Sequence, residues 1–395
     1  MKLHANLVQA VVEALHEIIG QGRHADKVIE RVLREDPRRG SRDRRFIAET
    51  TYDIIRWKRL FEAAGGSSDP AVLTGVWLIA QNIPLTNPSW FGHPDEQRIR
   101  RILNSDLPRA VRESIPDWLD DIGSRELGDA WPAELAALNQ PAPVVLRVNR
   151  LKTDPVQLLE ALRDEGVEAQ PANGLPDAIV LSRRMNVFRT QSFADGLFEI
   201  QDGGSQQIAP FLSPRPGMRI VDACAGAGGK TLHLAALMGN TGRIIAMDTG
   251  ENKLQELRKR ARRAGASTIE TRLIEDSRII KRLAASADAV LLDVPCSGTG
   301  VLRRNPDAKW KLSAESLDQT RVLQQDILKR YSTMVKPGGV LVYATCSILP
   351  SENREQVTGF LNDQPDFSLE AERSLLPSGG TDGFYMARLR KSDQR

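Results

Sequence analysis

Residues 206–395 alternate between strand-like and helix-like segments, and this alternation restricts the fold more than any other feature of the sequence. Short apolar runs bounded by turn residues predict strands at 218–223, 243–248, 268–274, 287–293 and 339–345. Helical spacing predicts helices at 230–238, from Glu251 onward, at 313–335 and at 351–361. Such alternation produces a mostly parallel, doubly wound sheet whose ligands bind at the carboxyl ends of the strands. We therefore predict an α/β fold with functional residues directly after its strands.

The remainder of the chain divides into a helical part and a mixed part. Apolar residues recur at three- and four-residue steps over 7–19, 26–33 and 46–61, which predicts helices there. Prolines interrupt 71–138 and leave the boundaries of further short helices open. Strands are predicted at 144–149, 177–182 and 196–201, with a helix over 154–166 that begins at an Asp-Pro pair. We predict three domains: helical at 1–138, small mixed α/β at 139–205, and the larger sheet at 206–395.

The composition is that of a folded globular protein, with 41% hydrophobic and 27% charged residues. No apolar run approaches the roughly 18 residues of a membrane-spanning helix. The N-terminal segment lacks the cleavage site of a signal peptide, so we expect a cytoplasmic protein. Cys224, Cys296 and Cys346 form no CxxC pair and have no histidine at ligand spacing, so neither a disulfide framework nor a metal site is predicted.

The positive charge is clustered, although the net charge is only +3. Residues 31–45 contain seven arginines and three acids, residues 251–263 contain six basic residues and two acids, and residues 299–311 contain four basic residues and one acid. Such clusters attract polyanions, of which nucleic acid is the commonest. A single run of this kind is a solvated helix face about as often as it is a binding site for a polyanion. Three such runs in one chain favour RNA or DNA as a partner.

The turn after the first predicted strand of the larger domain, DACAGAGGKT (222–231), matches neither common phosphate-binding loop. A Walker A loop requires glycine where Cys224 stands, and the dinucleotide fingerprint requires glycine or alanine where Thr231 stands. A small-residue turn still lets the backbone approach a ligand and directs helix N-terminal amides at a carboxylate. Asp248, at the end of the next strand, supplies an acceptor for a ribose diol. A ligand with a ribose and a carboxylate but no phosphate suits S-adenosylmethionine.

Two further strand ends each carry a cysteine, Cys296 after 287–293 and Cys346 after 339–345. A cysteine there is usually a small buried hydrophobe, but two at one sheet edge favour thiol chemistry. Carbon 5 of a pyrimidine is too weak a nucleophile to take a methyl group unaided. A thiolate that adds at carbon 6 activates it, and a second thiol can assist release. Asp293 is expected to hydrogen-bond the cytosine ring nitrogen or amine. This chemistry fits either thiol as the nucleophile.

Four segments resemble motifs of the Sun/Nop (RsmB-type) family of RNA cytosine-5 methyltransferases. They are DACAGAGGKT, DVPCSGTGVLRRNPDAKW (293–310), LVYATCSILPSENREQV (341–357) and FEIQDGGSQ (198–206). The resemblance covers about 141–390 and implies a Rossmann-like class I methyltransferase domain preceded by an RRM/ferredoxin-like domain. Residues 1–138 resemble the N-terminal segment of such enzymes, which implies an RNA-binding accessory domain; a NusB-like fold is a candidate that the pattern alone does not establish.

The resemblance also implies roles for individual residues. Cys346 would be the nucleophile, Cys296 the cysteine that assists release, Asp293 the acid that contacts the base, and Lys230 a neighbour of the active-site face. The turn departs from the family in one respect, since Gly226 and Ala227 stand where alanine-proline is usual. The residues expected to hold S-adenosylmethionine are Cys224, Ala225, Gly226, Ala227, Gly228, Gly229, Lys230, Asp248, Asp276 and Asp293.

The expected reaction forms 5-methylcytosine in RNA, with 16S ribosomal RNA as the expected substrate and no membrane or metal partner, in a chain that acts as a monomer. Transfer RNA is an alternative substrate, because nothing in the larger sheet domain encodes which RNA is docked. A second alternative is an RNA-binding ribosome assembly factor with a vestigial methylase core. The presence of both Cys296 and Cys346 argues against that alternative, because a protein without activity has no need of two thiols at strand ends.

Overall fold

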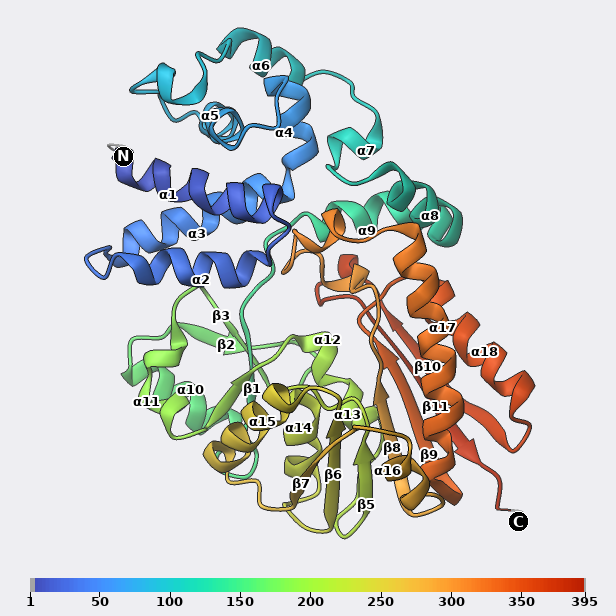
Figure 1. Cartoon of the computed structure of the whole chain (residues 1–395). Coiled ribbons are helices and arrows are strands. Elements are labelled where there is room, and N and C mark those ends of the chain that lie inside the picture. Colours follow the sequence, from blue (N-terminus) through green and yellow to red (C-terminus); the bar gives the residue numbers. More distant parts are fainter. Residues whose placement is uncertain (1–3, 394–395) are drawn as a thin grey trace. The chain divides into compact units, whose positions relative to one another are not determined.

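A computed structural model describes residues 4–393, which form two compact units (Figure 1). The first unit contains residues 4–140 together with 302–314, and the second contains 141–301 together with 315–393. Within the described residues, no helix is both long enough and apolar enough to cross a membrane.

The first unit is helical. Its core is formed by apolar side chains of α1, α3 and α5, including Val11, Ile54 and Leu78, none of which is exposed. The helix predicted over 46–61 is two helices, because the backbone of Trp57 leaves the helical conformation (φ −105°, ψ 19°). The helices are α1 (Ala5–Leu15), α2 (Ala25–Glu35), α3 (Ser41–Arg56), α4 (Lys58–Gly65), α5 (Pro70–Ala80), α6 (Glu96–Leu103), α7 (Arg109–Arg112), α8 (Asp117–Leu127) and α9 (Trp131–Leu138).

Residues 302–314 cap helices of the first unit, although they belong to a loop of the sheet domain in sequence order. Asp307 accepts a hydrogen bond from the first backbone N–H of α2, that of Ala25 (3.1 Å). Lys309 and Trp310 donate hydrogen bonds to the last two carbonyls of α3, each with a donor–acceptor distance of 2.8 Å. Each contact satisfies a backbone group that a helix end leaves unpaired.

The prediction of a basic RNA-facing cluster over 299–311 is therefore wrong for its central residues. Lys309 is 2% exposed and Arg303 is 5% exposed. Burial, with the neighbouring Arg56, lowers the pKa of Lys309 to about 7. A charge count along the sequence cannot distinguish a basic residue that faces solvent from one that caps a helix.

The second unit begins with a four-stranded antiparallel sheet of order β2-β3-β1-β4. The three predicted strands and the helix are confirmed, and the structure adds the short edge strand β2. Leu158 and Leu162 of the helix pack on the sheet beside Leu146 and Ile179. The elements are β1 (Val145–Val148), α10 (Pro155–Asp164), β2 (Ala169–Pro171), β3 (Ala178–Leu181), α11 (Gln191–Ala194) and β4 (Phe198–Ile200).

The larger sheet of the second unit has seven strands in the order β10-β11-β9-β8-β5-β6-β7. The five strands from β9 to β7 are mutually parallel, as predicted. Beyond β9 the sheet continues with β11, which is antiparallel to β9, and then with β10, which is antiparallel to β11. The strands are β5 (Arg219–Asp222), β6 (Arg243–Asp248), β7 (Ile269–Leu273), β8 (Ala287–Asp293), β9 (Val335–Thr345), β10 (Phe367–Leu375) and β11 (Phe384–Lys391).

Helices cover both faces of this sheet, which makes it doubly wound. One apolar cluster joins the sheet to α13, α14 and α15, and another joins it to α16, α17 and α18. These elements are α12 (Gly203–Gln206), α13 (Ile208–Phe211), α14 (Gly229–Leu237), α15 (Glu251–Ala264), α16 (Arg278–Arg282), α17 (Ala314–Tyr331) and α18 (Arg354–Asp363).

Two boundaries differ from the sequence predictions. The helix expected over 313–335 ends at Tyr331, and β9 begins at Val335 instead of 339. The hairpin of β10 and β11 was not predicted. Buried and exposed residues do not alternate strictly along these two strands, so the sequence lacks the usual pattern of a strand there. β10 is mostly exposed, whereas the first four residues of β11 are all buried.

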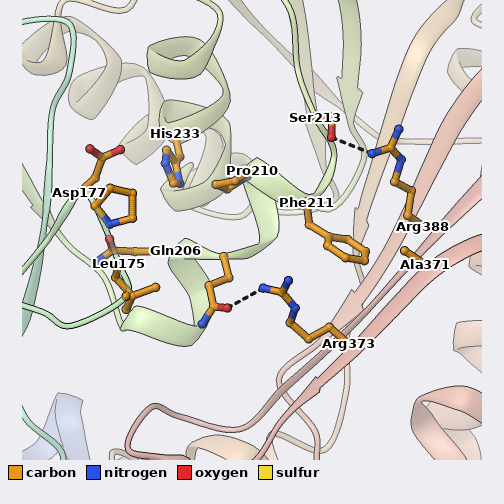
Figure 2. Close-up of a pocket in the computed structure, with 13 residues that line it drawn as sticks. Leu175, Asp177, Gln206, Pro210, Phe211, Ser213, His233, Ala371, Arg373 and Arg388 are labelled. Atoms are coloured by element: carbon orange, nitrogen blue, oxygen red, sulfur yellow. Dashed lines mark hydrogen bonds between the residues drawn. The ribbon is translucent and has the colours of Figure 1, made fainter.

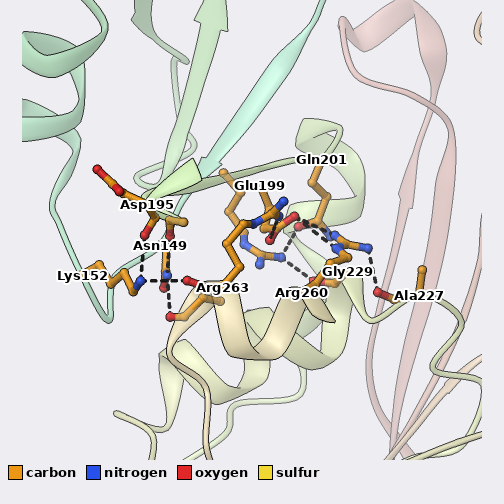
Figure 3. A network of polar contacts seen from close by, with 12 residues as sticks. Asn149, Lys152, Asp195, Glu199, Gln201, Ala227, Gly229, Arg260 and Arg263 are labelled. Atoms are coloured by element: carbon orange, nitrogen blue, oxygen red, sulfur yellow. Dashed lines mark hydrogen bonds and ion pairs between the residues drawn. The ribbon is translucent and has the colours of Figure 1, made fainter. Parts of the chain in front are cut away.

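Charged side chains join the small sheet to the larger one (Figure 3). Glu199 on β4 is 4% exposed and forms ion pairs with Arg260 (2.9 Å) and Arg263 of α15. Arg147 on β1 is 2% exposed and donates to Gln201 and to the carbonyl of Gly229. Two arginines of the predicted 251–263 RNA cluster thus hold the protein together internally.

Replacing Glu199 with alanine is expected to leave Arg260 and Arg263 without their carboxylate in a largely buried site. Removing one partner of a buried ion pair typically costs about 3–5 kcal/mol, and partial exposure of the arginines reduces this to about 2–4 kcal/mol. Urea unfolding measures the change.

The matched control is Glu270→Ala. Glu270 also pairs with two arginines, Arg243 and Arg272, but its side chain is 39% exposed. That change is expected to cost less than about 1 kcal/mol. Equal losses in the two variants would show that the Glu199 network does not join the two sheets.

Candidate functional site

The glycine-rich turn after β5 lies beside the acid at the end of β6. Asp248 accepts backbone hydrogen bonds from Gly226 (2.9 Å, Oδ2) and Gly250 (2.8 Å, Oδ1). The Lys253 ammonium also lies 3.5 Å from Oδ1. Because a carboxylate has about four lone-pair sites, one on Oδ2 remains for a ligand hydroxyl. The parallel pairing of β5 and β6 explains this proximity, because both strands end at the same edge of the sheet.

Two glycines of the turn have conformations that other residues rarely adopt. Gly226 has φ 54° and Gly228 has φ 88°. A Cβ on Gly228 would lie 2.5 Å from Leu257, so α15 packs directly against the turn. A Cβ on Gly226 would meet nothing within 4 Å, so open space lies beside this backbone. Space next to the turn and the remaining acceptor site of Asp248 fit a ligand with a ribose.

Arginines hold the turn from the side of the small sheet. Arg260 donates to the carbonyl of Ala227 (2.7 Å), and Arg147 donates to that of Gly229. These two guanidinium groups restrain the backbone of the turn.

Lys230 and Asp293 form an ion pair of 2.6 Å beside the turn. Burial alone would lower the pKa of Lys230, but the Asp293 carboxylate outweighs burial and raises it. Lys230 therefore stays charged and holds the carboxylate of Asp293 at the end of β8. Its ammonium also lies 5.6 Å from the centre of the Phe384 ring.

The two strand-end cysteines meet, with their sulfur atoms 3.2 Å apart. They follow neighbouring parallel strands whose residues Asp293 and Ala344 are paired in register. Both thiols are free and half-buried. The contact with Cys346, together with burial, raises the pKa of Cys296 well above its ordinary value. Cys296 therefore keeps its proton and can donate it toward Cys346.

Two predicted site residues are not part of this cluster of side chains. Burial raises the pKa of the Cys224 thiol far above its usual range, so Cys224 contributes backbone and packing and no thiolate. The ion pairs and hydrogen bonds of Asp276 within residues 4–393 all run to Arg278, and its side chain is 41% exposed. In the same part of the chain, no group of three or more acidic, histidine or cysteine side chains could hold a metal ion.

Sequence reasoning missed Glu352, which joins the two cysteine-bearing loops. Glu352 is completely buried and accepts hydrogen bonds from the backbone N–H of Ser297 (2.8 Å), from the Ser297 and Ser347 hydroxyls, and from Gln324 (3.1 Å). Ser297 follows Cys296, and Ser347 follows Cys346, so one carboxylate holds both loops. The sequence gives one hint of this role, because Glu352 is an acid within 351–361, a segment predicted to form a packed helix.

Comparisons with known proteins identify the family of the chain. A family model described as "16S rRNA methyltransferase RsmB/F" matches residues 209–390, and one described as "Methyltr_RsmF/B-like, ferredoxin-like domain" matches 115–188. A Synechocystis protein named as a probable ribosomal RNA small subunit methyltransferase B is 31% identical over 96% of this chain and 98% of its own length. Ribosomal RNA small subunit methyltransferase B of Pasteurella multocida is 36% identical over 75% of this chain and 72% of its own length.

Solved structures share the fold. The crystal structure of a protein called PH0851 covers 99% of this chain and 100% of that one, with a TM-score of 0.85 and 24% identity. NSun6 from Pyrococcus horikoshii, solved with SFG, covers 72% of this chain and 100% of that one, with a TM-score of 0.65 and 21% identity.

Glu352→Gln tests whether this carboxylate holds the thiols in place. Glutamine keeps the shape but puts an N–H group where two serine hydroxyls now donate. We expect the turnover number to fall about 10- to 100-fold with KM values within about twofold, because a misplaced thiol slows chemistry without weakening binding.

Single-turnover kinetics measure this effect, and Glu355→Gln, an exposed glutamate on α18, is the matched control. An unchanged turnover number, or a loss explained entirely by a lower unfolding midpoint, would contradict a positioning role.

Proposed function

The chain belongs to the RsmB/F family of 16S rRNA methyltransferases, and on that premise we propose that it methylates carbon 5 of a cytosine in 16S ribosomal RNA. The contact between the Cys296 and Cys346 sulfurs, beside the Lys230–Asp293 ion pair, supports this proposal most directly. A thiol pair next to an acid is what addition to a pyrimidine ring and later release require.

The methyl donor of the family is S-adenosylmethionine. When bound, it supplies an electrophilic methyl group on a sulfonium sulfur. In the proposed site, the backbone of 224–230 approaches this ligand, and the remaining acceptor site of Asp248 takes a ribose hydroxyl. Asp276 belongs to the proposed set by resemblance, and its present contacts with Arg278 leave its carboxylate exposed to solvent.

In the proposed mechanism, the Cys346 thiolate adds to carbon 6 of the cytosine. Asp293, held by Lys230, hydrogen-bonds the ring nitrogen or amine and stabilises the charge that develops on the ring. The bound donor would supply the methyl group to carbon 5, and its bond between sulfur and that methyl group would break. The carbon 5 proton then leaves to solvent water, and its electron pair restores the double bond to carbon 6 as the bond between Cys346 and carbon 6 breaks. The product is released and the Cys346 thiolate is regenerated.

The roles of the two thiols are assigned by resemblance to the family, because the contact between their sulfur atoms lets either one donate to the other. This contact and burial raise the pKa of Cys296, which supports a proton-carrying role for that thiol. We therefore take Cys346 as the nucleophile and Cys296 as the cysteine that assists release.

Ribosomal RNA is favoured over transfer RNA by the names of the two relatives given above, both of which refer to the small ribosomal subunit. The proposed substrate also implies action in the cytoplasm. Bisulfite sequencing of total RNA from cells with and without the protein tests the choice. A cytosine in 16S RNA that loses methylation supports the proposal, and one in transfer RNA instead contradicts it.

The two cysteines can be separated by mutation. Cys346→Ala is expected to lower methylation at least about a thousandfold and to form no covalent adduct with RNA. Cys296→Ala still adds through Cys346 and then stalls, leaving a protein–RNA adduct that survives denaturing electrophoresis. Adducts in Cys346→Ala and none in Cys296→Ala would reverse the two roles.

Asp248→Asn removes the charge and one acceptor while keeping the shape of the side chain. Affinity for S-adenosylmethionine is expected to fall about ten- to a hundredfold, because a hydrogen bond to a charged group typically contributes about 1.5–3 kcal/mol. Calorimetry measures the affinity of this variant and of Asp276→Asn, which tests the second acid separately. Unchanged affinity in Asp248→Asn would contradict the proposed ribose contact.

A further inference from the structure

A cavity of about 370 Å³ lies in the second unit, and it contains none of the residues assigned above (Figure 2). Its walls come from the loop 174–177 of the small sheet, from α12 and α13, from His233 on α14, and from Arg373 and Arg388 on the β10–β11 hairpin. Its volume is at the lower end of the range for small-ligand sites.

His233 lines this cavity and has no hydrogen-bond partner. The side chain is 3% exposed, and neither ring nitrogen bonds to any group in residues 4–393. Burial lowers the pKa of His233 well below its ordinary value, so the ring is neutral and offers one donor and one acceptor. A buried polar group without a partner is destabilising, and a bound ligand is one way to satisfy it.

Arg373 supplies a positive charge at the edge of the cavity. Its guanidinium donates to the Gln207 side chain (3.0 Å) and lies 5.9 Å from the centre of the Phe211 ring. Among the residues that the structure describes, no carboxylate pairs with it. Arg388, by contrast, is paired with Glu370 (2.9 Å) and donates to Ser213 (2.7 Å).

These features together match the chemistry of a nucleotide. An unpaired guanidinium attracts a phosphate, an aromatic ring with a cation beside it provides a surface for a base, and a neutral imidazole can hydrogen-bond a base edge. Asp177, the acid in the cavity wall, is paired with Arg150 (3.4 Å) and does not cancel the charge of Arg373.

We propose that this cavity binds one nucleotide of the RNA substrate away from the methylated cytosine, with its phosphate on Arg373 and its base between Phe211 and His233. The proposal rests on the proposed function, because it takes the ligand to be part of an RNA. It gives the second unit a contact with RNA that does not involve the two thiols.

The test compares binding of a fluorescently labelled single-stranded RNA 12-mer to the full chain and to Arg373→Gln. The variant is expected to bind about three- to tenfold more weakly, and the slope of log affinity against log salt is expected to become shallower by about 0.7, as for one lost phosphate contact on a single strand. Phe211→Leu, which keeps an apolar side chain, is expected to weaken binding about fivefold.

The matched control is Arg163→Gln, because Arg163 on α10 is another exposed arginine that has no carboxylate partner in the described chain. Affinity for S-adenosylmethionine, measured by calorimetry, is expected to be the same in all variants. Adenosine monophosphate is a second probe: if it alone binds tightly and loses affinity in Arg373→Gln while the 12-mer does not, the ligand is a free nucleotide and the proposal is overturned.

Two further outcomes separate this proposal from the proposed function. If the wild-type chain binds the 12-mer and Arg373→Gln matches Arg163→Gln in affinity and salt slope, the cavity is filled by water only and this proposal alone fails. If the wild-type chain binds no RNA and methylates none, both proposals fail. Unfolding midpoints within about 2 °C of wild type confirm that the variants are folded.

Discussion

The ion pairs between Glu199 and two arginines of α15 connect the small sheet to the turn on which the proposed cofactor site depends. Arg260 forms an ion pair with Glu199 and also donates to the carbonyl of Ala227 (Figure 3). Arg147 donates to the carbonyl of Gly229, two residues further along the turn. Because these charges are largely enclosed, separating them from each other would cost far more than separating a surface pair. The small sheet thus helps to hold the turn through these contacts.

The thiol pair depends on a different constraint, the register of two parallel strands. Asp293 and Ala344 are opposite each other, so the loops that follow β8 and β9 leave the sheet side by side and bring Cys296 and Cys346 together. Register alone does not hold the sulfur atoms at 3.2 Å, because loops move. Glu352 adds that restraint by bonding the residue after each cysteine. The two thiols and the carboxylate that holds their loops therefore all follow strands that end at the same edge of the sheet.

The loop that carries Cys296 continues directly into residues 302–314, which are part of the helical unit. Asp307, Lys309 and Trp310 cap α2 and α3, so this segment has a fixed place in the core of that unit. The chain therefore passes from the loop that carries Cys296 directly into the helical unit. Lys309 serves a helix end and Arg303 is also buried, which explains why these two members of the charge cluster do not face solvent.

The sequence by itself determined the alternation of strands and helices, the parallel core of the larger sheet, and the positions of the glycine turn, Asp248, Asp293 and both cysteines at strand ends. These follow from local periodicity and turn chemistry, which act over a few residues. Tertiary structure decided which charges face solvent, because burial of Arg260 and Lys309 depends on partners far along the chain. It also decided the role of Glu352, the pairing of the β10–β11 hairpin and the cavity at His233. Such features arise where distant segments pack, and no local pattern encodes that contact.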